Sequence, residues 1–190
     1  EYFGHQPSDG SGDVYFHLDP LWAHPAIDAI GIDNYLPLAD WRDGDHAGTS
    51  PDGAAGPYDA KALRAAIAGG ERFDWHYASD AARRMRQRSA ITDGAYGKPW
   101  VFRPKDIVSW WSNPHHDRPG GVEAATPTAF VPRSKPIWFT ELGCPACDKG
   151  PNQPNVFVDP KSAESALPPS PQICVASGKT GNGRASQAHR

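Results

Sequence analysis

The chain has 190 residues, a net charge of −3 and an apolar fraction of 38%, with 11% aromatic residues. This length is usual for one domain but falls short of the roughly 250 residues of a complete eight-stranded α/β barrel. The net negative charge argues against a nucleic-acid-binding protein, and the sequence shows neither an apolar run long enough to span a membrane nor an N-terminal signal segment. Because the chain begins at Glu1 and not at Met, we expect it to be processed or a piece of something longer.

The residues between positions 1 and 38 predict one short helix and one strand. Asp19 can cap a helix that has Pro20 at its first position. The apolar run 27–33 is typical of a buried strand, and Asn34 and Tyr35 follow where it ends. We therefore expect polar and aromatic groups at the carboxyl end of this strand.

The middle of the chain predicts two helices and a loop. Residues 39–56 form an excursion rich in Asp and Gly, followed by a helix over 57–68 and a second helix over 75–88 that ends in a basic cluster. That cluster could contact phosphate, but basic residues also suit the end of a helix, and we favour this structural role. Residues 98–102 predict a short strand or turn.

The loop 107–121 concentrates Trp110, Trp111, His115, His116 and Asp117. Loops of this composition usually either pack over a core or line a site. The two histidines and Asp117 could bind a metal or act as an acid–base pair, but adjacent histidines in an extended segment point to opposite sides. We favour histidines that hydrogen-bond to the backbone.

A second buried strand is predicted where Ile137, Trp138 and Phe139 run into Thr140 and Glu141. Glu141 then lies at the carboxyl end of the strand, where catalytic groups collect in barrels of alternating strands and helices. The alternative is a solvent-facing carboxylate or one paired with an arginine. Beyond this strand the chain becomes polar, and we expect residues 171–190 to be disordered.

The motifs that would indicate other chemistries are missing from the sequence. It contains no Gly-x-Ser-x-Gly motif, phosphate loop or dinucleotide fingerprint. The three cysteines, Cys144, Cys147 and Cys174, give no disulfide framework, and the first two form a lone pair without the further ligands of a zinc site. We predict no metal and no cofactor.

A carboxylate beside aromatic residues suits carbohydrate chemistry, because sugar rings present apolar faces and hydroxyl rims. Tyr35 and the tryptophans could supply stacking surfaces. Hydrolysis needs two carboxyl groups, about 5–5.5 Å apart for retention or roughly 6.5–9.5 Å for inversion. Asp33 is the best-placed second carboxylate after Glu141. The residues that we expect to bind sugar are Asn34, Trp41, Trp110, Trp111, His115, His116, Asp117 and Trp138.

The segment Pro136–Gly143 resembles the seventh strand of the large glycoside hydrolase clan built on the eight-stranded α/β barrel, and Ile27–Pro37 resembles its sixth strand. This resemblance implies that Glu141 is the nucleophile and that Tyr35 is the aromatic residue that hydrogen-bonds to it. It also implies that the clan's acid/base Glu, at the end of the fourth strand, is absent from this chain. We therefore expect this piece to be nearly inactive by itself, because acid catalysis typically contributes about 10²–10⁴-fold.

More specifically, residues 1–170 resemble the TIM-barrel-like domain of bacterial gene transfer agents, which occurs in large proteins of the glycoside hydrolase/phage tail family. The run Trp110–Gly121 is the most specific stretch of the resemblance. Further similar stretches are Glu1–His5, Asp40–Gly44, Ile91–Gly97, Gly150–Phe157 and Lys161–Pro169.

The resemblance implies an α/β fold that is the C-terminal part of a TIM (β/α)8 barrel of glycoside hydrolase type. Residues 1–170 would hold about strands five to seven, with residues 38–134 as a long insertion, and the aberrant tail 171–190 would depart from the family. Such a half barrel would have open strand edges that invite pairing with other chains, so we expect the chain alone to aggregate or to need the missing half.

Three functional hypotheses follow. The first is a glycosidase-like domain in the tail of a phage-like particle, made in the bacterial cytoplasm. It would act on cell-envelope or capsular polysaccharide during particle attachment and would contact other tail or baseplate proteins. The second is a non-catalytic glycan-binding or structural tail module with the same fold. The third, a metal-dependent hydrolase that uses His115, His116 and Asp117, is the weakest.

Overall fold

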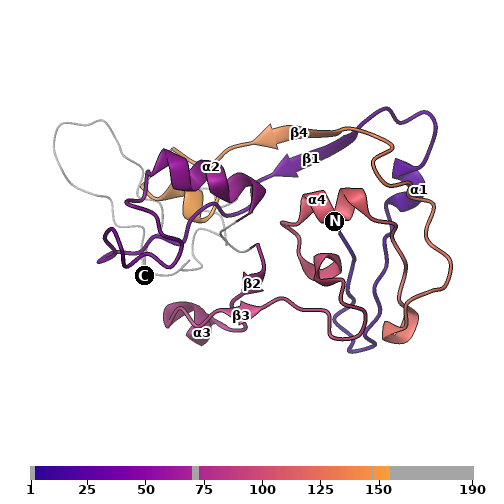
Figure 1. Ribbon diagram of the computed structural model, residues 1–190, viewed down its shortest axis with the longest axis horizontal. Helices are drawn as coiled ribbons and strands as arrows, with labels where there is room; N and C mark the ends of the chain where they lie inside the picture. The colour runs from indigo at the N-terminus through magenta and orange to yellow at the C-terminus, as the bar shows by residue number, and fades with distance from the viewer. Residues whose placement is uncertain (1–2, 70–72, 147, 155–190) are drawn as a thin grey trace, which may run out of the picture. The chain divides into compact units, whose positions relative to one another are not determined.

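The computed structural model describes residues 3–69, 73–146 and 148–154 (Figure 1). The predicted disorder of residues 171–190 lies outside this range. Within it, no helix is both long and apolar enough to cross a bilayer. The elements in chain order are α1 Asp19–Trp22, β1 Ile30–Asn34, α2 Ala60–Ala68, β2 Trp75–His76, α3 Asp80–Arg84, β3 Ser89–Ala90, η1 Pro99–Phe102, α4 Ile107–Ser112, η2 Pro119–Gly121, β4 Ile137–Leu142 and η3 Gly150–Asn152.

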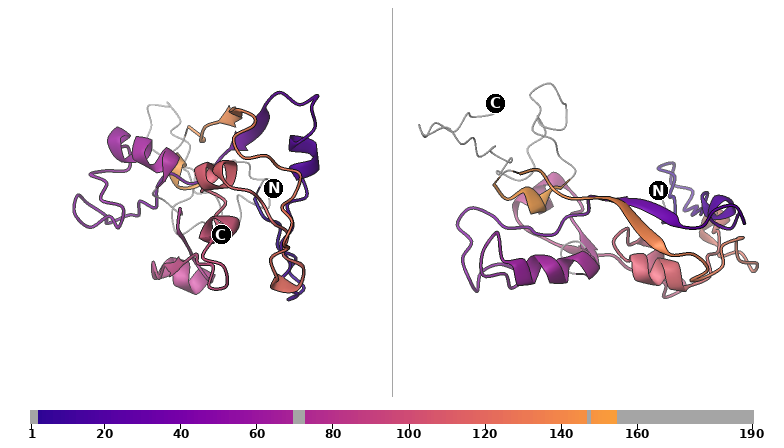
Figure 2. Two further views of the ribbon diagram at one scale, coloured as in Figure 1. Left: turned by 45° about the vertical axis from the view of Figure 1, so that its right-hand side comes forward. Right: turned by 90° about the horizontal axis from the view of Figure 1, so that it is seen from above.

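Strands β1 and β4 pair in a two-stranded sheet, although α2, α3 and α4 all lie between them in the sequence. Their arrows point the same way in Figure 1 and run alongside each other from above in Figure 2, so the pair is parallel. The backbone N–H of Ile30 donates to the carbonyl of Pro136 at 2.9 Å where the pair begins. A parallel pair needs a long crossover connection, which the intervening chain supplies. Both predicted strands are therefore confirmed as elements.

The two strands differ in how their side chains are covered. In β1, Ile30, Ile32 and Asn34 are buried and the two residues between them are exposed. In β4, every side chain from Trp138 to Leu142 is exposed, so the prediction of a buried strand is wrong for these side chains. The physical reason is that, among the described residues, β1 is the one strand that pairs with β4. No closed barrel forms within this part of the chain, where the other sheet is the short pair β2–β3.

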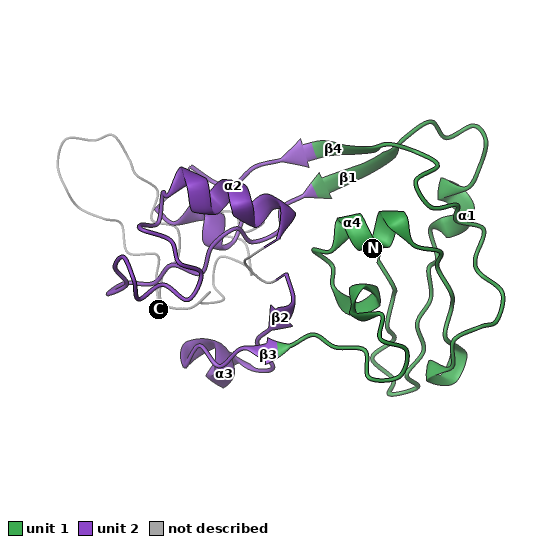
Figure 3. Cartoon of the chain, viewed as in Figure 1, with its two compact units in different colours: residues 1–33, 90–140 green, residues 34–89, 141–190 purple. Residues whose placement is uncertain are grey.

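The chain divides into two compact units, each made of two segments (Figure 3). Unit 1 comprises residues 1–33 and 90–140, and unit 2 comprises residues 34–89 and 141–190. The boundaries fall inside β1 and inside β4, so that each unit receives part of both strands.

Unit 1 is built around an aromatic core. The core residues are Val14, Phe16, Ile30, Ile32, Trp100, Val101, Trp110 and Phe130. Trp100 and Val101 come from η1, a 3-10 helix that replaces the predicted strand or turn. Trp110 comes from α4, which begins after Asp106, whose carboxylate accepts from the backbone N–H of Ser109. The predicted loop 107–121 therefore begins with a short helix, and the packing of this helix puts one of its tryptophans in the core.

Asp19 behaves differently from the sequence prediction. The short helix α1 is present, but Asp19 is its first residue, and the preceding Leu18 makes no side-chain capping bond. The carboxylate of Asp19 is instead fully buried, and it lies 2.8 Å from Nδ1 of His115. The hydroxyl of Thr128 also donates to it. The prediction of a helix cap was wrong because these distant partners compete for the same oxygens.

In unit 2, the helix predicted over 57–68 is confirmed as α2. Asp59 caps it by accepting from the backbone N–H groups of Lys61 and Ala62, and Gly69 follows its last residue. The helix predicted over 75–88 was wrong. Its span contains β2 and the single turn of α3, then runs into β3, because Ser79 starts α3 by accepting from Ala82.

Candidate active site

Glu141 and Tyr35 come together in unit 2, where β4 and β1 end. The phenolic O–H of Tyr35 donates to Oε2 of Glu141 at 2.7 Å. Glu141 is exposed to solvent, as the end of an exposed strand requires. A phenol that donates to a carboxylate fixes its orientation and stabilises its negative charge. The contact is the one that the glycoside hydrolase resemblance implies, whereas the catalytic roles of the two residues stay predictions.

The end of β1 is set by the side chain of Asn34. Its Oδ1 accepts from the backbone N–H of Leu36 at 3.2 Å, which turns the chain immediately after the strand. Asn34 is itself buried, with 6% of its surface exposed. In this position it shapes the loop that carries Tyr35, and its predicted contact with sugar is untested.

Asp33, the second carboxylate considered from the sequence, has a partner on the neighbouring strand. The hydroxyl of Thr140 donates to Oδ1 of Asp33 at 2.6 Å, across the β1–β4 pair within unit 1. This cross-strand bond ties the two strands together close to their carboxyl ends. It occupies one carboxylate oxygen and leaves Asp33 on the exposed face of β1.

The four tryptophans predicted to bind sugar occupy different environments. Trp138 in unit 1 is the most open, with 62% of its surface exposed. Trp111 is half-buried, and its Nε1–H donates to the carbonyl of Lys135 at 2.7 Å. Trp110 is completely buried in the core of unit 1, and Trp41 is buried in unit 2. Trp138 is therefore the tryptophan whose ring can meet a sugar without any rearrangement.

His115 belongs to the core of unit 1. Its Nδ1 faces Asp19, and its Nε2 lies 2.8 Å from the carbonyl oxygen of Trp110. Its ring stacks between Phe16 and Phe130, with centroid distances of 4.4 and 4.1 Å. A histidine held on both nitrogens and both faces organises the core, and its access to a substrate would require the core to open.

His116 and Asp117 also hold the fold of unit 1. Nδ1 of His116 lies 2.8 Å from the carbonyl of Ala124, and Oδ1 of Asp117 accepts from the backbone N–H of Phe16 at 2.9 Å. Within the described ranges, no cluster of three or more His, Cys, Asp or Glu side chains could hold a metal ion. Nε2 of His115 and Nδ1 of His116 each face a backbone carbonyl, as we expected for histidines that hydrogen-bond to the backbone.

Unit 2 contains a buried charge network that the sequence analysis did not anticipate. Asp40 is 3.2 Å from Nε of Arg42 and 3.7 Å from the guanidinium groups of Arg86 and Arg88, and it also accepts from the hydroxyl of Tyr77. The acidic excursion 39–56 and the basic cluster after it carry opposite charges, which was the available signal. The basic cluster therefore has the structural role that we favoured, but by ion pairing after α3 and not along a long helix.

Arg86 joins this network to a second carboxylate, Asp45. Its guanidinium donates to both oxygens of Asp45, and the backbone N–H of Arg42 donates to one of them. Burial opposes the charge of Asp45, but the hydrogen bonds from Arg86 and Arg42 outweigh it and hold the pKa of Asp45 below its ordinary value. Asp45 is therefore ionised at neutral pH and acts as a fixed acceptor.

Comparison with protein families matches residues 1–179 to the gene transfer agent TIM-barrel-like domain. The match includes both paired strands, the aromatic core of unit 1 and the charge network of unit 2. It extends past residue 170, where the resemblance seen in the sequence ended. A search of curated proteins found no match to the chain. Since the family match covers most of the sequence, the chain belongs to the family of gene transfer agent TIM-barrel-like domains.

Proposed function

We propose that the chain is the C-terminal part of a glycoside-hydrolase-like barrel, and that it acts on or binds a cell-surface polysaccharide when a phage-like particle attaches. The observation that carries this proposal is the hydrogen bond from Tyr35 to Glu141 at the carboxyl ends of two parallel strands. In TIM barrels the active site lies at that end of the strands. The family match supports a TIM-barrel-like domain related to gene transfer agents.

In this proposal Glu141 is the nucleophile of a retaining reaction. Its Oε1 or Oε2 attacks the anomeric carbon, the bond to the leaving oxygen breaks, and a glycosyl-enzyme forms that water then hydrolyses. Tyr35 holds the carboxylate in place through its hydroxyl. Trp138 is exposed on β4 in unit 1, and we propose that its ring contacts the polysaccharide away from the reacting bond.

The reaction also needs a carboxylic acid that protonates the leaving oxygen. In a retaining enzyme this group lies about 5–5.5 Å from the nucleophile. Asp33 already accepts from Thr140, so we assign the acid/base to another part of the barrel and not to this residue. The proposal therefore requires this chain to work together with the remaining strands, and its partners are the polysaccharide and neighbouring tail or baseplate proteins.

A non-catalytic glycan-binding tail module is the second candidate. The observation that favours it is the exposed aromatic surface of β4, where Trp138 and Phe139 are open to solvent beside a single strand-end carboxylate. Aromatic faces next to hydrogen-bonding groups bind sugars without any chemistry. In this case Glu141 would be a relic of the fold that takes part in no turnover.

The decisive experiment compares wild type with Glu141→Gln in the full-length parent protein, with purified envelope polysaccharide and peptidoglycan as substrates. The amide keeps the shape of the side chain and removes its negative charge. For a nucleophile, we expect sugar release to fall by at least about 10³-fold while glycan binding persists. If wild type releases no sugar and both proteins bind glycan equally, the hydrolase is excluded and the binding module remains.

Tyr35→Phe tests the positioning role separately. Loss of a hydrogen bond to a charged group costs about 1.5–3 kcal/mol, which corresponds to roughly ten- to hundredfold in rate. Tyr15→Phe is the matched control, because the Tyr15 hydroxyl also donates to a carboxylate, that of Asp13, in unit 1. Activity unchanged in Tyr35→Phe, or lost equally in Tyr15→Phe, would contradict the positioning role.

A further inference from the structure

The loops that follow β1 and β4 are joined to each other in unit 2. The backbone N–H of Leu38 donates to the carbonyl of Pro151 at 2.9 Å. The side chain of Asn152 contacts the backbone of Trp41 at both of its polar groups: Oδ1 accepts from the N–H at 3.2 Å, and Nδ2 donates to the carbonyl at 2.7 Å. A side-chain amide that satisfies both backbone groups of one residue replaces the partner that a neighbouring strand would provide. The two loops therefore stay connected beyond the point where the paired strands end.

The loop after β4 is held in a conformation that a free chain rarely adopts. Lys149 has left-handed backbone angles, φ 54° and ψ 27°, which disfavour residues with a side chain. Burial opposes the charge of Lys149, but its hydrogen bonds to Asp43 at 2.6 Å and to Asp148 at 3.0 Å outweigh burial and raise its pKa. At Gly150, any side chain would collide with the carbonyl oxygen of Pro145. Strained backbone of this kind persists where its surroundings fix it, and it concentrates at functional sites.

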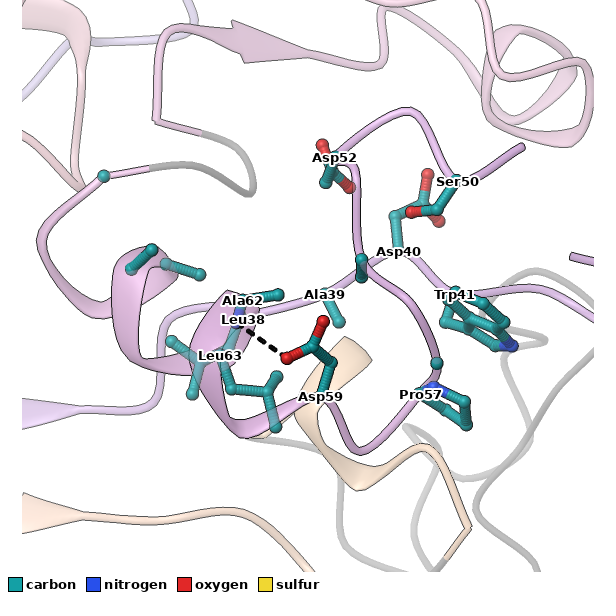
Figure 4. Close-up of a pocket in the computed structure, with 15 residues that line it drawn as sticks. Leu38, Ala39, Asp40, Trp41, Ser50, Asp52, Pro57, Asp59, Ala62 and Leu63 are labelled. Carbon is teal, nitrogen blue, oxygen red and sulfur yellow. Dashed lines mark hydrogen bonds between the residues drawn. The ribbon is translucent and has the colours of Figure 1, made fainter. Parts of the chain in front are cut away.

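The loop after β1 lies beside α2. Leu38 and Trp41 of this loop line a pocket of about 200 Å³ together with Ala62 and Leu63 of the helix (Figure 4). Trp41 is itself buried, with 7% of its surface exposed. Asn152 therefore attaches the loop after β4 to a segment that is already ordered next to a capped helix, and not to a freely moving one.

We propose that Asn152 is a positioning residue for the hydrogen-bonded pair of Tyr35 and Glu141. Tyr35 lies in the loop after β1, and Glu141 lies next to the start of the loop after β4. By holding the backbone of Trp41, Asn152 fixes the separation of the two loops and keeps the phenol within reach of the carboxylate. This proposal rests on the function proposed above and deepens it, because it names a residue beyond the strand ends that orients the proposed nucleophile.

The first test observes Tyr35 directly in the full-length protein and needs no enzymatic activity. Tyrosine labelled with ¹³C at the ring carbon Cζ gives one NMR signal for each tyrosine, and Tyr35→Phe identifies the signal of Tyr35. Glu141→Gln shows where this signal lies when the phenol no longer donates to a carboxylate. We expect Asn152→Ala to move the signal toward that position, and the signal of Tyr15, whose hydroxyl donates to Asp13 in unit 1, to stay in place. An unmoved Tyr35 signal in folded Asn152→Ala would overturn the proposal.

Two further variants separate positioning from general stability. Asn113→Ala is the matched control, because Nδ2 of Asn113 also donates to a backbone carbonyl, that of Ser109, at 2.8 Å but in unit 1. If Asn152→Ala does not fold, Asn152→Asp makes the same test, since it keeps an acceptor for the N–H of Trp41 and loses the donor to its carbonyl. A Tyr35 signal that moves as far in Asn113→Ala as in the Asn152 variants contradicts the positioning role.

A double-mutant cycle measures the effect on the reaction. If Asn152 acts through the bond from Tyr35 to Glu141, Asn152→Ala should lower kcat about tenfold and leave KM within about twofold. The double variant Tyr35→Phe/Asn152→Ala should then be no slower than Tyr35→Phe, because the same bond can be lost only once. Losses that multiply in the double variant would show that Asn152 supports the fold alone.

The two measurements also separate this proposal from the proposed function. If wild type releases no sugar but Asn152→Ala moves the Tyr35 signal, the hydrolase fails and the positioning role stands. If sugar release depends on Glu141, but Asn152→Ala changes neither the Tyr35 signal nor kcat, the positioning role fails and the hydrolase stands.

Discussion

The interiors of the two units of this chain are stabilised by different sets of interactions. Unit 1 buries a continuous cluster of aromatic and aliphatic side chains, among them Phe16, Trp110 and Phe130. In the described part of unit 2, the buried apolar side chains are those of Trp41, Ala66 and Trp75, and the carboxylate of Asp40 is surrounded by three arginines. Unit 1 also buries charged side chains, since Asp19 contacts His115 and Asp93 pairs with Arg118. The units therefore differ in that unit 1 adds an extensive apolar core to its paired charges, whereas the described part of unit 2 relies on its charge network with few buried apolar side chains.

This difference determines how the stability of each unit responds to lost side-chain volume, to salt and to pH. An apolar core responds to lost volume but hardly to salt or pH, because no net charge changes on burial. A buried ion network is stabilising only while all of its members are present, since each charge left without a partner pays the full cost of desolvation. We therefore expect Glu141, in unit 2, to lie in the part of the chain that is more sensitive to salt and pH.

The largest expected effect is on unit 1. Trp110→Ala removes a completely buried indole and should cost about 3–5 kcal/mol of unfolding free energy. Hydrogen exchange of the backbone amides of Val14 and Ile30 measures it locally, because both residues belong to the same core. Trp138→Ala, at an exposed tryptophan of unit 1, should stay within about 0.5 kcal/mol. Equal effects of the two variants would show that unit 1 has no such core.

The next effect is on unit 2. Asp40→Asn removes the charge shared by Arg42, Arg86 and Arg88 and should cost about 3 kcal/mol, since three cations then face one another in a partly buried site. The matched control is Asp80→Asn, whose exposed pair with Arg83 should contribute less than about 0.5 kcal/mol. The amide of Trp75, under Arg88, reports on unit 2 in hydrogen exchange. Loss of protection confined to unit 1 would contradict the assignment.

The sequence predicts elements where local signals and packing agree. The runs that become β1 and β4 are apolar and bounded by turn residues, and α2 has both a cap at Asp59 and a glycine at its end. The helix expected over 75–88 failed because Trp75 packs under the guanidinium of Arg88, and Arg86 and Arg88 pair with acidic residues of the preceding excursion. No local pattern encodes a partner that lies 30 or more residues away.

The residues of the candidate site also divide into those that could be placed from the sequence and those that could not. Glu141 and Tyr35 could be placed from the sequence because Glu141 lies near the end of one strand, Tyr35 follows directly after another, and a family resemblance supplied the pairing. Trp110 and His115 were equally conspicuous, but their burial depends on Asp19 and Phe130, which come from distant segments. Unit 2 also contains a pocket lined in part by residues of α2, which could not be predicted, since Ala residues on a helix indicate nothing about the space that they leave.

A smaller effect is the response of unit 2 to acid. Hydrogen bonds from Tyr58 and Lys149 lower the pKa of Asp148, and those from Arg86 and Arg42 lower that of Asp45 against the effect of burial. A depressed pKa in the folded state adds stability above the unfolded value of about 3.9, and this stability is lost as the pH falls through the folded pKa.

We therefore expect amide protection in unit 2 to fall as the pH is lowered from about 5 to about 3, and to fall further than in unit 1. In unit 1 the corresponding group is Asp93, whose pKa is lowered by a hydrogen bond from Arg118 in spite of burial. Asp45→Asn should reduce the pH dependence of unit 2 and leave that of unit 1 as it is. An earlier loss of protection in unit 1 would reverse the comparison.

The smallest expected effect comes from a helix cap in unit 2, and it tests whether α3 unfolds alone or together with the rest of the unit. Ser79→Ala removes the oxygen that accepts from the backbone N–H of Ala82 at the start of α3, which typically costs about 1 kcal/mol. Ser79→Asp should restore the loss, because Asp caps equally well and its charge suits a helix N-terminus. If unit 2 is held by its charge network, exchange should change in α3 alone. A change that also reaches α2 would mean that α3 and the network unfold together, and unit 2 would then unfold as one cooperative structure.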